Sequence, residues 1–212
     1  MKLFLSDFDG TLVGRDILGV VSGINGTADL DKKLHDETMR EMIAGIRNHD
    51  KLKQRIDLLR GITTAQIKQK LDENNYLNAG AGELFAYLKS QGFKTVLHTG
   101  NILPVAEYYQ NLLGIDYVVC NRPRMSGDSI AGIEITDFAA ADFKTAGCME
   151  IIKKLNVPRE NIWAIGDSIV DLGVFKLAGT SVAINAKEGI EKHADIVLKT
   201  GDLRELIPYL AG

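Results

Sequence analysis

The sequence predicts an α/β protein: a doubly wound parallel sheet with a small helical domain inserted after the first strand. Short apolar runs recur along the chain and stop abruptly at polar residues, as buried parallel strands do. Amphipathic helical patterns, such as residues 82–91 and 144–155, lie between these runs. One long segment, residues 16–78, breaks the alternation and shows helical spacing only. Strands that alternate with helices favour right-handed crossovers and a parallel sheet.

Five apolar runs are predicted to be strands. The first covers residues 2–6 and stops at Asp7, and the others are residues 95–98, 117–120, 162–165 and 180–184. The helix at 82–91 ends at Gly92, a residue suited to the left-handed conformation that closes many helices. Residues 125–135, which contain Ser126-Gly127-Asp128, are predicted to form a β-hairpin.

The segment after the first strand is predicted to be a helical insert that lies over the end of that strand. Leucine, methionine and isoleucine recur there at helical spacing, and Thr63 or Thr64 is suited to cap a further helix. A structureless loop of this length is improbable in a compact domain. We therefore expect a core domain of residues 1–14 and 80–212 and a cap domain of residues 15–79.

Composition and charge exclude several classes of partner. With 25 basic and 28 acidic side chains, the net charge of -3 gives no reason to expect nucleic acid or an anionic membrane surface. No apolar run approaches the roughly 20 residues that span a bilayer, and the first residues turn acidic too early for a signal peptide. Cys120 and Cys148 make neither a disulfide framework nor a metal-binding spacing. A cytoplasmic enzyme is the expectation, and the oligomeric state stays open.

Polar side chains follow three of the predicted strands at the points where the strands end. They are Asp7 and Asp9, then Thr99, Gly100 and Asn101, then Asp167 and Asp171. Lys144 begins the helix that leads toward the last of these strands. Because ligands of open α/β sheets bind beyond the carboxyl ends of the strands, we expect all of these groups to converge on one site.

The acidic groups suit the transfer of a phosphoryl group. The carboxylates of Asp7, Asp9 and Asp167 concentrate negative charge, which a hard cation such as Mg²⁺ neutralises. Such a cation can also polarise a phosphoryl group. A carboxylate nucleophile can form an acyl phosphate while a second carboxylate serves as general acid and base. We assign the first role to Asp7 and the second to Asp9.

The remaining groups are expected to hold the phosphate. Lys144 and the Thr99 hydroxyl can bind phosphate oxygens, and the Gly100 amide can assist because glycine permits close approach. Asp171 is expected to orient Lys144 or to complete the acidic shell. Taken singly, a strand-end aspartate commonly caps a turn, a lone lysine is commonly solvated, and His98 is as readily packed as in contact with substrate. The complete set in this order makes coincidence improbable.

Four ordered motifs resemble those of the haloacid dehalogenase superfamily: Asp7-Phe8-Asp9-Gly10-Thr11-Leu12-Val13, Thr99-Gly100, Lys144 and Gly166-Asp167-Ser168-Ile169-Val170-Asp171. Within it, the chain resembles the phosphoserine phosphatases over nearly its whole length, including the helical insert after the first motif. The resemblance implies a Rossmann-like core with a small cap, Asp7 as nucleophile and Asp9 as acid/base. It also implies Mg²⁺ held by Asp7, the Asp9 carbonyl and Asp167, and phosphate contacts from Thr99, Gly100 and Lys144.

Substrate choice is expected to lie in the cap. Phosphoserine phosphatases hold the amino-acid end of the substrate with a Glu shortly after the first motif and an Arg in the cap, and the corresponding positions here are Asp16 and Arg55. Arg55 would clamp a carboxylate with two hydrogen bonds, and Asp16 would meet an ammonium group. The alternative for Arg55 is a surface position on an amphipathic helix. Asn101 is a further candidate substrate contact.

The chain departs from the phosphoserine phosphatase pattern but keeps the nucleophile, the metal ligands and the phosphate-holding lysine. Thr99-Gly100-Asn101-Ile102 stands where that family has Ser-Gly-Gly-Phe, and Val170 stands where it has Asn. Gly10 and Ser168 replace Ser and Gly. We predict a Mg²⁺-dependent phosphatase for a small phosphorylated metabolite, with a phosphoserine-like substrate first. The alternatives are a nucleotide or sugar phosphatase and a non-catalytic phosphate-binding protein on the same fold.

Overall fold

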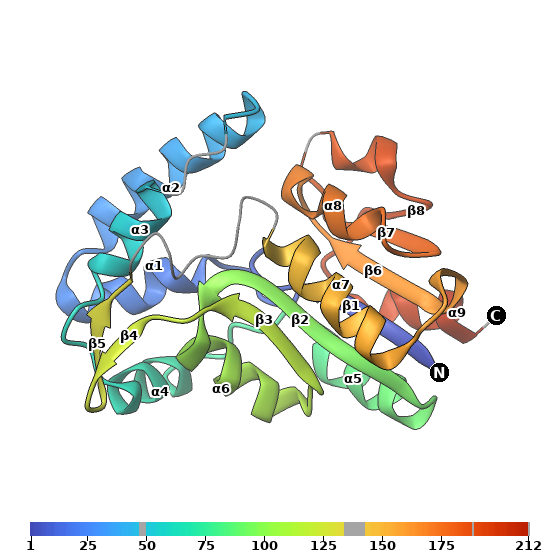
Figure 1. The fold of residues 1–212 in the computed structure, drawn as a ribbon, viewed down its shortest axis with the longest axis horizontal. Helices are drawn as coiled ribbons and strands as arrows, with labels where there is room; N and C mark the ends of the chain where they lie inside the picture. The colour runs from blue at the N-terminus through green and yellow to red at the C-terminus, as the bar shows by residue number, and fades with distance from the viewer. Residues whose placement is uncertain (47–49, 134–142, 188, 212) are drawn as a thin grey trace.

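The computed structural model describes residues 1–46, 50–133, 143–187 and 189–211, and within them six parallel strands form one sheet (Figure 1). The strands are β1 (Lys2–Asp7), β2 (Phe93–Ile102), β3 (Tyr117–Asn121), β6 (Ile162–Gly166), β7 (Thr180–Ile184) and β8 (Ile196–Leu198). Their order is β3-β2-β1-β6-β7-β8, so the chain fills the sheet outward from β1 first on one side and then on the other. The predicted doubly wound α/β fold is confirmed.

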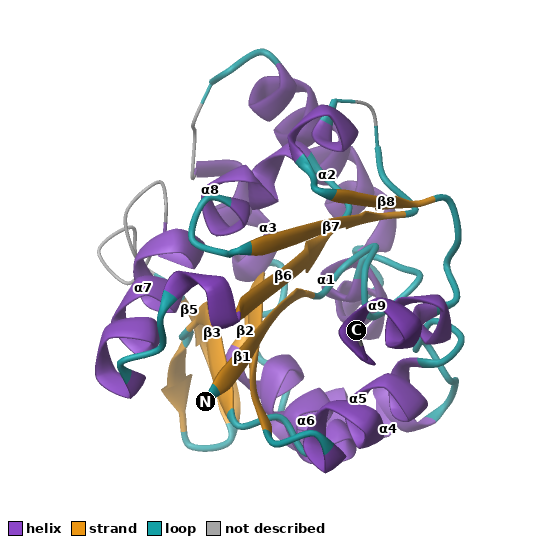
Figure 2. Ribbon diagram, turned by 90° about the vertical axis from the view of Figure 1, so that its right-hand side faces the viewer, coloured by secondary structure: helices purple, strands orange, loops and turns teal. Residues whose placement is uncertain are grey.

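Helices cover both faces of this sheet (Figure 2). On one face lie α5 (Ala81–Ser90), α6 (Leu103–Leu113) and α9 (Ile207–Ala211), and on the other lie α7 (Phe143–Leu155) and α8 (Leu172–Phe175). Successive side chains of β1 alternate between the two layers, since Phe4 packs edge to face on Phe85 of α5 with ring centroids 6.3 Å apart, whereas Leu3 and Leu5 cluster with Cys148 of α7. Burial on both faces explains why the strands appear in the sequence as continuous apolar runs.

Four α-helices occupy residues 15–46 and 50–79, between β1 and the return to the sheet. They are α1 (Ile17–Ser22), α2 (Ala28–Ile43), α3 (Asp50–Asp57) and α4 (Thr64–Asp72), and they gather at the end of the sheet where β1 stops (Figure 1). The two connections to the sheet lie side by side, because the Gly14 N–H donates to the Tyr76 carbonyl at 3.1 Å and the Asn78 N–H donates to the Leu12 carbonyl at 2.8 Å. The division into core and cap domains stays a prediction.

Local signals at the ends of elements behave as the sequence predicts. Thr63 is the N-cap of α4, and it forms a capping box with Gln66. The predicted hairpin is confirmed as β4 (Arg124–Ser126) and β5 (Ser129–Gly132), which pair antiparallel; residues 134 and 135 lie outside the described residues. Among the described residues, no helix is both long and apolar enough to cross a membrane.

Three details differ from the sequence-based expectation. The second strand does not stop before Thr99: β2 continues to Ile102, and its pairing with β3 shifts register between His98 and Ile102. Polar residues therefore interrupt the apolar run without ending the strand. The short strand β8 has three residues, too few for a recognisable pattern. On α2, Leu30 and Ile43 fall at helical spacing with the buried residues but are 49% and 75% exposed.

Asp116 ties the edge strand β3 to β2. Its carboxylate accepts hydrogen bonds from the Thr95 N–H at 2.9 Å and the Thr95 hydroxyl at 3.1 Å, and it pairs with the Lys94 ammonium at 2.6 Å. Partial burial alone would raise the pKa of Asp116, but the bonds from Lys94 and Thr95 outweigh it and hold the pKa below its ordinary value. The ionised carboxylate therefore stabilises the fold at neutral pH.

Asp116→Asn is expected to lower the free energy of unfolding at pH 7 by about 1–2 kcal/mol, because hydrogen bonds to a charged group are lost. A lowered folded-state pKa contributes stability that is present above the unfolded pKa and is lost as pH falls through the folded pKa. The difference from wild type should therefore persist down to about pH 4 and shrink below it. Urea denaturation across this range measures it, with Glu107→Gln on the exposed side of α6 as control. An undiminished difference well below pH 4 would contradict the assignment.

Candidate functional site

The loop after β1 turns two alternate side chains toward the same pocket. Asp7 is the last residue of β1, and Phe8 points the other way into the core, where its ring centroid lies 4.8 Å from that of Tyr109. The loop closes through backbone hydrogen bonds, including one from the Gly10 N–H to the Val13 carbonyl at 2.8 Å. Gly10 has a φ of 90°, which a residue with a side chain adopts only under strain.

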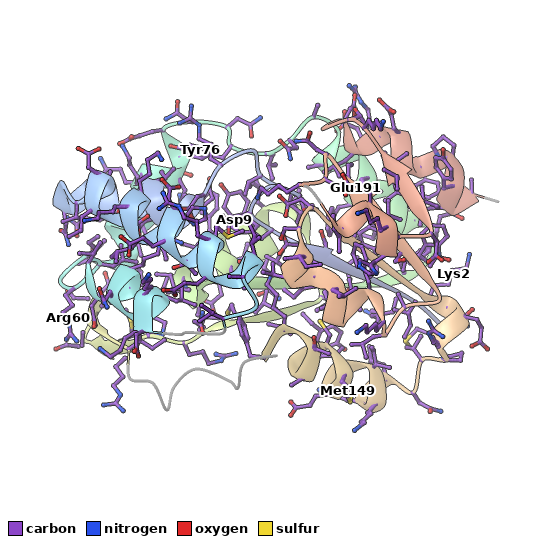
Figure 3. All side chains as sticks on the ribbon, turned by 90° about the horizontal axis from the view of Figure 1, so that it is seen from above. Lys2, Asp9, Arg60, Tyr76, Met149 and Glu191 are labelled. Carbon is purple, nitrogen blue, oxygen red and sulfur yellow. The ribbon has the colours of Figure 1, made fainter. Side chains whose placement is uncertain are left out.

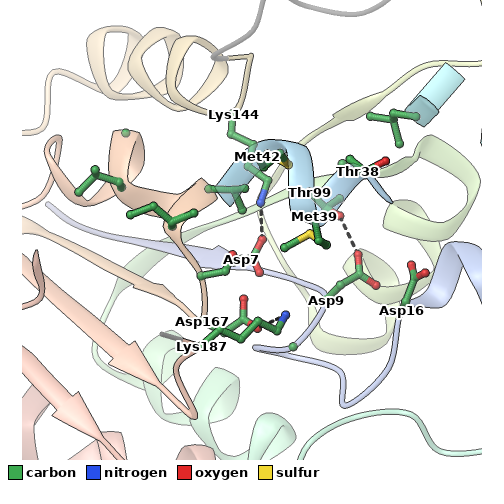
Figure 4. Close-up of a pocket in the computed structure, with 18 of the residues that line it drawn as sticks. Asp7, Asp9, Asp16, Thr38, Met39, Met42, Thr99, Lys144, Asp167 and Lys187 are labelled. Carbon is green, nitrogen blue, oxygen red and sulfur yellow. Dashed lines mark hydrogen bonds and ion pairs between the residues drawn. The ribbon is translucent and has the colours of Figure 1, made fainter. Parts of the chain in front are cut away.

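Lys144 joins two buried carboxylates at the centre of the site. Its Nζ lies 2.6 Å from Asp7 Oδ1 and 3.1 Å from Asp171 Oδ1, and the contact with Asp7 is drawn in Figure 4. Burial alone would lower the pKa of Lys144, but the charges of Asp171 and Asp7 outweigh it, so the pKa is raised and the ammonium stays charged. Burial, together with the charge of Asp7, raises the pKa of Asp171 to about 7.

Asp9 is held beside the start of α1. The Ile17 N–H donates to Asp9 Oδ1 at 2.9 Å, and the Thr99 hydroxyl lies 3.5 Å from Asp9 Oδ2 (Figure 4). Burial, together with the negative charge of Asp16, raises the pKa of Asp9 to about 7. A carboxyl group with this pKa can both give and take a proton near neutral pH, which is what a general acid and base must do.

Asp167 follows β6 and lies against the Gly10 backbone. A Cβ atom at Gly10 would lie 2.1 Å from Asp167 Oδ2, so a side chain here would displace this carboxylate from its position. The Lys187 ammonium pairs with Asp167 Oδ2 at 2.7 Å, and the Lys187 side chain is 59% exposed (Figure 4). Burial and the nearby charge of Asp7 raise the pKa of Asp167.

The charges at this site suit a divalent cation. Asp7, Asp9, Asp167 and Asp171 supply four carboxylates, and Lys144 and Lys187 supply two ammonium groups, so two negative charges remain when all are ionised. Burial, and after it the charge of neighbouring carboxylates, raises the pKa of three of these carboxyl groups. Hard oxygen donors with excess negative charge are what Mg²⁺ binds.

A second acidic group in the same region has another explanation. Asp7, His98 and Asp171 offer ligand atoms within 4.8 Å of one another. Lys144 already bridges both carboxylates of this group, so the positive charge it needs comes from the protein. His98 is fully buried and does not line the pocket, and burial lowers its pKa to about 3. Of the two alternatives for His98, the structure therefore supports a packed residue and not a contact with substrate.

A pocket of about 830 Å³ opens onto these groups. Figure 3 places Asp9 in the middle of the molecule, between the helices that follow β1 and the strands that follow α7. Helix α2 lies across the pocket from Asp7, and Thr38, Met39 and Met42 of α2 face the acidic groups (Figure 4). Val170 and Leu172 also line the pocket. The pocket thus has a charged floor and apolar sides.

Most of the predicted site residues line this one pocket. They are Asp7, Asp9, Asp16, Arg55, Thr99, Gly100, Lys144 and Asp167. Asp171 lies directly behind, buried against Lys144. Asn101 is not brought to the pocket: it is 1% exposed, and its side-chain oxygen accepts a hydrogen bond from the Ile102 N–H. Arg55 is no surface residue, because its side chain is 7% exposed and its guanidinium pairs with Asp31 and Asp16.

Sequence reasoning missed Lys187, Asp31 and His35. Lys187 comes shortly after β7 ends, so the strand-end argument that found Asp167 would have found it as well. Asp31 and His35 are four residues apart on α2 and therefore share a helix face. Two polar side chains on the same face as the buried Leu34 were a signal that this face meets other polar groups.

Comparisons with known proteins identify a family and relatives that match most of the chain. A family model described as haloacid dehalogenase-like hydrolase matches residues 4–176. A phosphoserine phosphatase of Albidiferax ferrireducens is 28% identical over 210 residues, which are 97% of this chain and 88% of the relative. One of Methanocaldococcus jannaschii is 27% identical over 213 residues, which are 99% of this chain and 97% of the relative.

Solved structures give the same picture. A substrate-bound phosphoserine phosphatase complex aligns with a TM-score of 0.84 at 26% identity, covering 98% of this chain and 97% of that one. A structure described as a phospho-aspartyl intermediate analogue of phosphoserine phosphatase aligns with a TM-score of 0.82 at 26% identity, covering 98% of each chain.

Gly10→Ala is expected to destabilise the protein more than Gly61→Ala, which causes similar backbone strain but no steric collision. Gly61 has a φ of 82°, close to the 90° of Gly10, but a Cβ there would meet no atom within 4 Å. Gly61→Ala should therefore lower the free energy of unfolding by about 1 kcal/mol from backbone strain. Gly10→Ala adds the collision with Asp167. Denaturation by urea compares the two variants, and equal losses would contradict the packing described for Asp167.

Proposed function

The chain belongs to the haloacid dehalogenase-like hydrolase family, and on that premise we propose that Asp7 is the nucleophile of a Mg²⁺-dependent phosphatase. The predicted class, a hydrolase of phosphate monoesters, is confirmed by the family and by relatives named phosphoserine phosphatase. One observation carries the assignment of residues: Asp7, Asp9, Thr99, Lys144 and Asp167 line a single pocket at the carboxyl ends of neighbouring strands.

The proposed reaction has two steps. An Asp7 carboxylate oxygen attacks phosphorus, the bond from phosphorus to the leaving alcohol oxygen breaks, and Asp9 gives that oxygen a proton. Water then attacks the phosphorus of the aspartyl phosphate while Asp9 takes its proton, which releases phosphate and restores the Asp7 carboxylate. The pKa of Asp9, about 7, supports both halves of this role.

The phosphate is proposed to bind between Lys144, the Thr99 hydroxyl and the Gly100 amide. The Lys144 ammonium lies against Asp7 Oδ1, so it is positioned to stabilise the negative charge of a phosphoryl group that bonds to Asp7. A Cβ at Gly100 would meet no other atom within 4 Å, which supports open space for a ligand at that amide. The Asn121 side chain donates to the Gly100 carbonyl at 2.7 Å and holds this part of β2 in place.

Asp7, the Asp9 carbonyl and Asp167 are the residues proposed to hold Mg²⁺. When bound, the ion would supply positive charge that polarises the phosphoryl group and reduces its repulsion from Asp7. The excess of four carboxyl groups over two ammonium groups at the site supports this fit. Lys187 is largely exposed, so its side chain can leave Asp167 for solvent when a cation takes its place.

The substrate is proposed to be a small phosphorylated metabolite, and esters that carry an amine are the first class to test. Asp16 lines the pocket close to Asp9 and supports an ammonium group beside the leaving oxygen. Phosphoserine belongs to this class, and the relatives are named for it. The 830 Å³ volume and the apolar sides are the specific reason to keep nucleotide and sugar phosphates as a second candidate.

Asp7→Asn is expected to reduce hydrolysis of p-nitrophenyl phosphate in Mg²⁺ by at least about 1,000-fold, because loss of a nucleophile typically has an effect of that size or more. Initial rates of nitrophenol release measure it. Asp72→Asn, which removes an exposed carboxylate of α4, serves as the matched control and should leave the rate unchanged. Wild type without turnover, or Asp7→Asn with undiminished turnover, would contradict the proposal.

Asp167→Asn is expected to weaken Mg²⁺ binding by at least about tenfold, because changes around metal ligands typically cost that much affinity. Titration calorimetry with MgCl₂ measures this without any substrate. The control is Asp195→Asn, since Asp195 bonds to Ser181 and does not line the pocket. Wild-type affinity in Asp167→Asn would remove Asp167 from the metal site while leaving the role of Asp7 to the hydrolysis assay.

A further inference from the structure

A polar subsite lies in the same pocket beside Asp9. Asp16 precedes α1, and the next residue, Ile17, donates its N–H to Asp9 Oδ1 at 2.9 Å. His35 of α2 and Arg55 of α3 complete the subsite. Because Asp9 is proposed to protonate the leaving oxygen, this subsite faces the leaving alcohol rather than the phosphate. Its charge therefore bears on which alcohol the enzyme accepts.

Arg55 has few donors left for a ligand. Its Nε and Nη2 donate to Asp31 Oδ1 and Oδ2, both at 2.9 Å, in a two-point pair. Nη2 also donates to Asp16, and Nη1 donates to His35 Nδ1 at 3.0 Å. A guanidinium has five N–H groups, so four are used. A clamp on a substrate carboxylate needs two parallel donors, and the fork that would supply them already holds Asp31.

Acidic groups outnumber cationic groups in the subsite. Arg55 cannot accept a hydrogen bond, so His35 Nδ1 must accept one, and His35 is then the neutral tautomer with its proton on Nε2. Burial also lowers the pKa of His35. One guanidinium therefore faces two carboxylates, Asp16 and the fully buried Asp31. Of these two, Asp16 lines the pocket, and its side chain is 26% exposed.

On the basis of the proposed phosphatase activity, we propose that the enzyme selects phosphate esters whose leaving alcohol carries an amine but no carboxylate. Asp31 is the positioning residue that sets this selectivity, because it holds Arg55. Short amino alcohols fit: their ammonium group meets Asp16, and Met39 and Met42 provide apolar contact. The carboxylate of phosphoserine would face Asp16 without a free guanidinium fork to bind it, which is unfavourable for a charge leaving water.

Two further observations bear on this assignment. A Cβ at Gly19 would lie 3.1 Å from Asp31 Oδ2 and 3.2 Å from Asp16 Oδ2, so glycine in α1 lets both carboxylates approach Arg55. Arg15 also lines the pocket and offers a second guanidinium to a carboxylate. It is exposed at the rim, where solvent screens a single ion pair and makes it weak.

The test is to measure kcat/KM for O-phosphoethanolamine, O-phosphoserine and p-nitrophenyl phosphate in Mg²⁺. Wild type is expected to prefer phosphoethanolamine over phosphoserine by about tenfold or more, the size of effect that one charge-assisted hydrogen bond gives. Asp31→Asn frees Arg55 from its charged partner and should lower that preference by about tenfold, chiefly through KM for phosphoserine. Because p-nitrophenyl phosphate has neither an amine nor a carboxylate, its rate should stay close to wild type.

The controls separate structural damage from selectivity. Asp36→Asn removes an exposed carboxylate on the same helix, paired with Lys32, and should leave the preference unchanged. A wild type that prefers phosphoserine, or an unchanged preference in Asp31→Asn, overturns the inference while leaving the phosphatase intact. Failure of wild type on all three esters would instead contradict the proposed function. If Asp31→Asn does not fold, the wild-type preference alone decides.

Discussion

The ion pair between Lys144 and two buried carboxylates is the interaction on which the rest of the site depends. Asp7 ends β1 and Asp171 follows β6, so the sheet brings two negative charges together at the point where its strand order reverses. The ammonium between them offsets the repulsion between these two carboxylates and part of the cost of burying them. The fold thus places the proposed nucleophile, Asp7, in the pocket beside Lys144 and further carboxylates, an arrangement that supports the proposed cation site.

The two ends of the pocket carry different charged groups. The end at Lys144 carries an ammonium held between Asp7 and Asp171 and suited to phosphate, whereas the end at Asp16 carries a guanidinium paired with Asp31. Asp9 lies between them, held by the first N–H of α1. This difference supports the proposed orientation of a phosphate ester, with its phosphorus at Asp7 and its alcohol toward α2. The apolar side chains of α2 face the space between these ends.

Strand-end logic predicted the sheet and its acidic centre because parallel strands bring their carboxyl ends together whatever lies between them. It placed Asp7, Asp9 and Asp167 correctly in one pocket. It could not foresee that Asp31 would occupy Arg55, since the two residues lie 24 positions apart on different helices and their pairing depends on how α2 packs on α3. Strand-end logic also could not predict that Asn101 lies away from the pocket, because the strand continues through that residue.

Chemical trapping at Asp7 tests the central claim most directly. The wild-type enzyme would be quenched during turnover in Mg²⁺ with p-nitrophenyl phosphate and treated with borohydride, which reduces an aspartyl phosphate to homoserine. Peptide mass spectrometry then locates the reduced residue. The account predicts homoserine at position 7, appearing only when the phosphate ester is present. Turnover without any reduced aspartate, or reduction at Asp9 or Asp167 in place of Asp7, would contradict it.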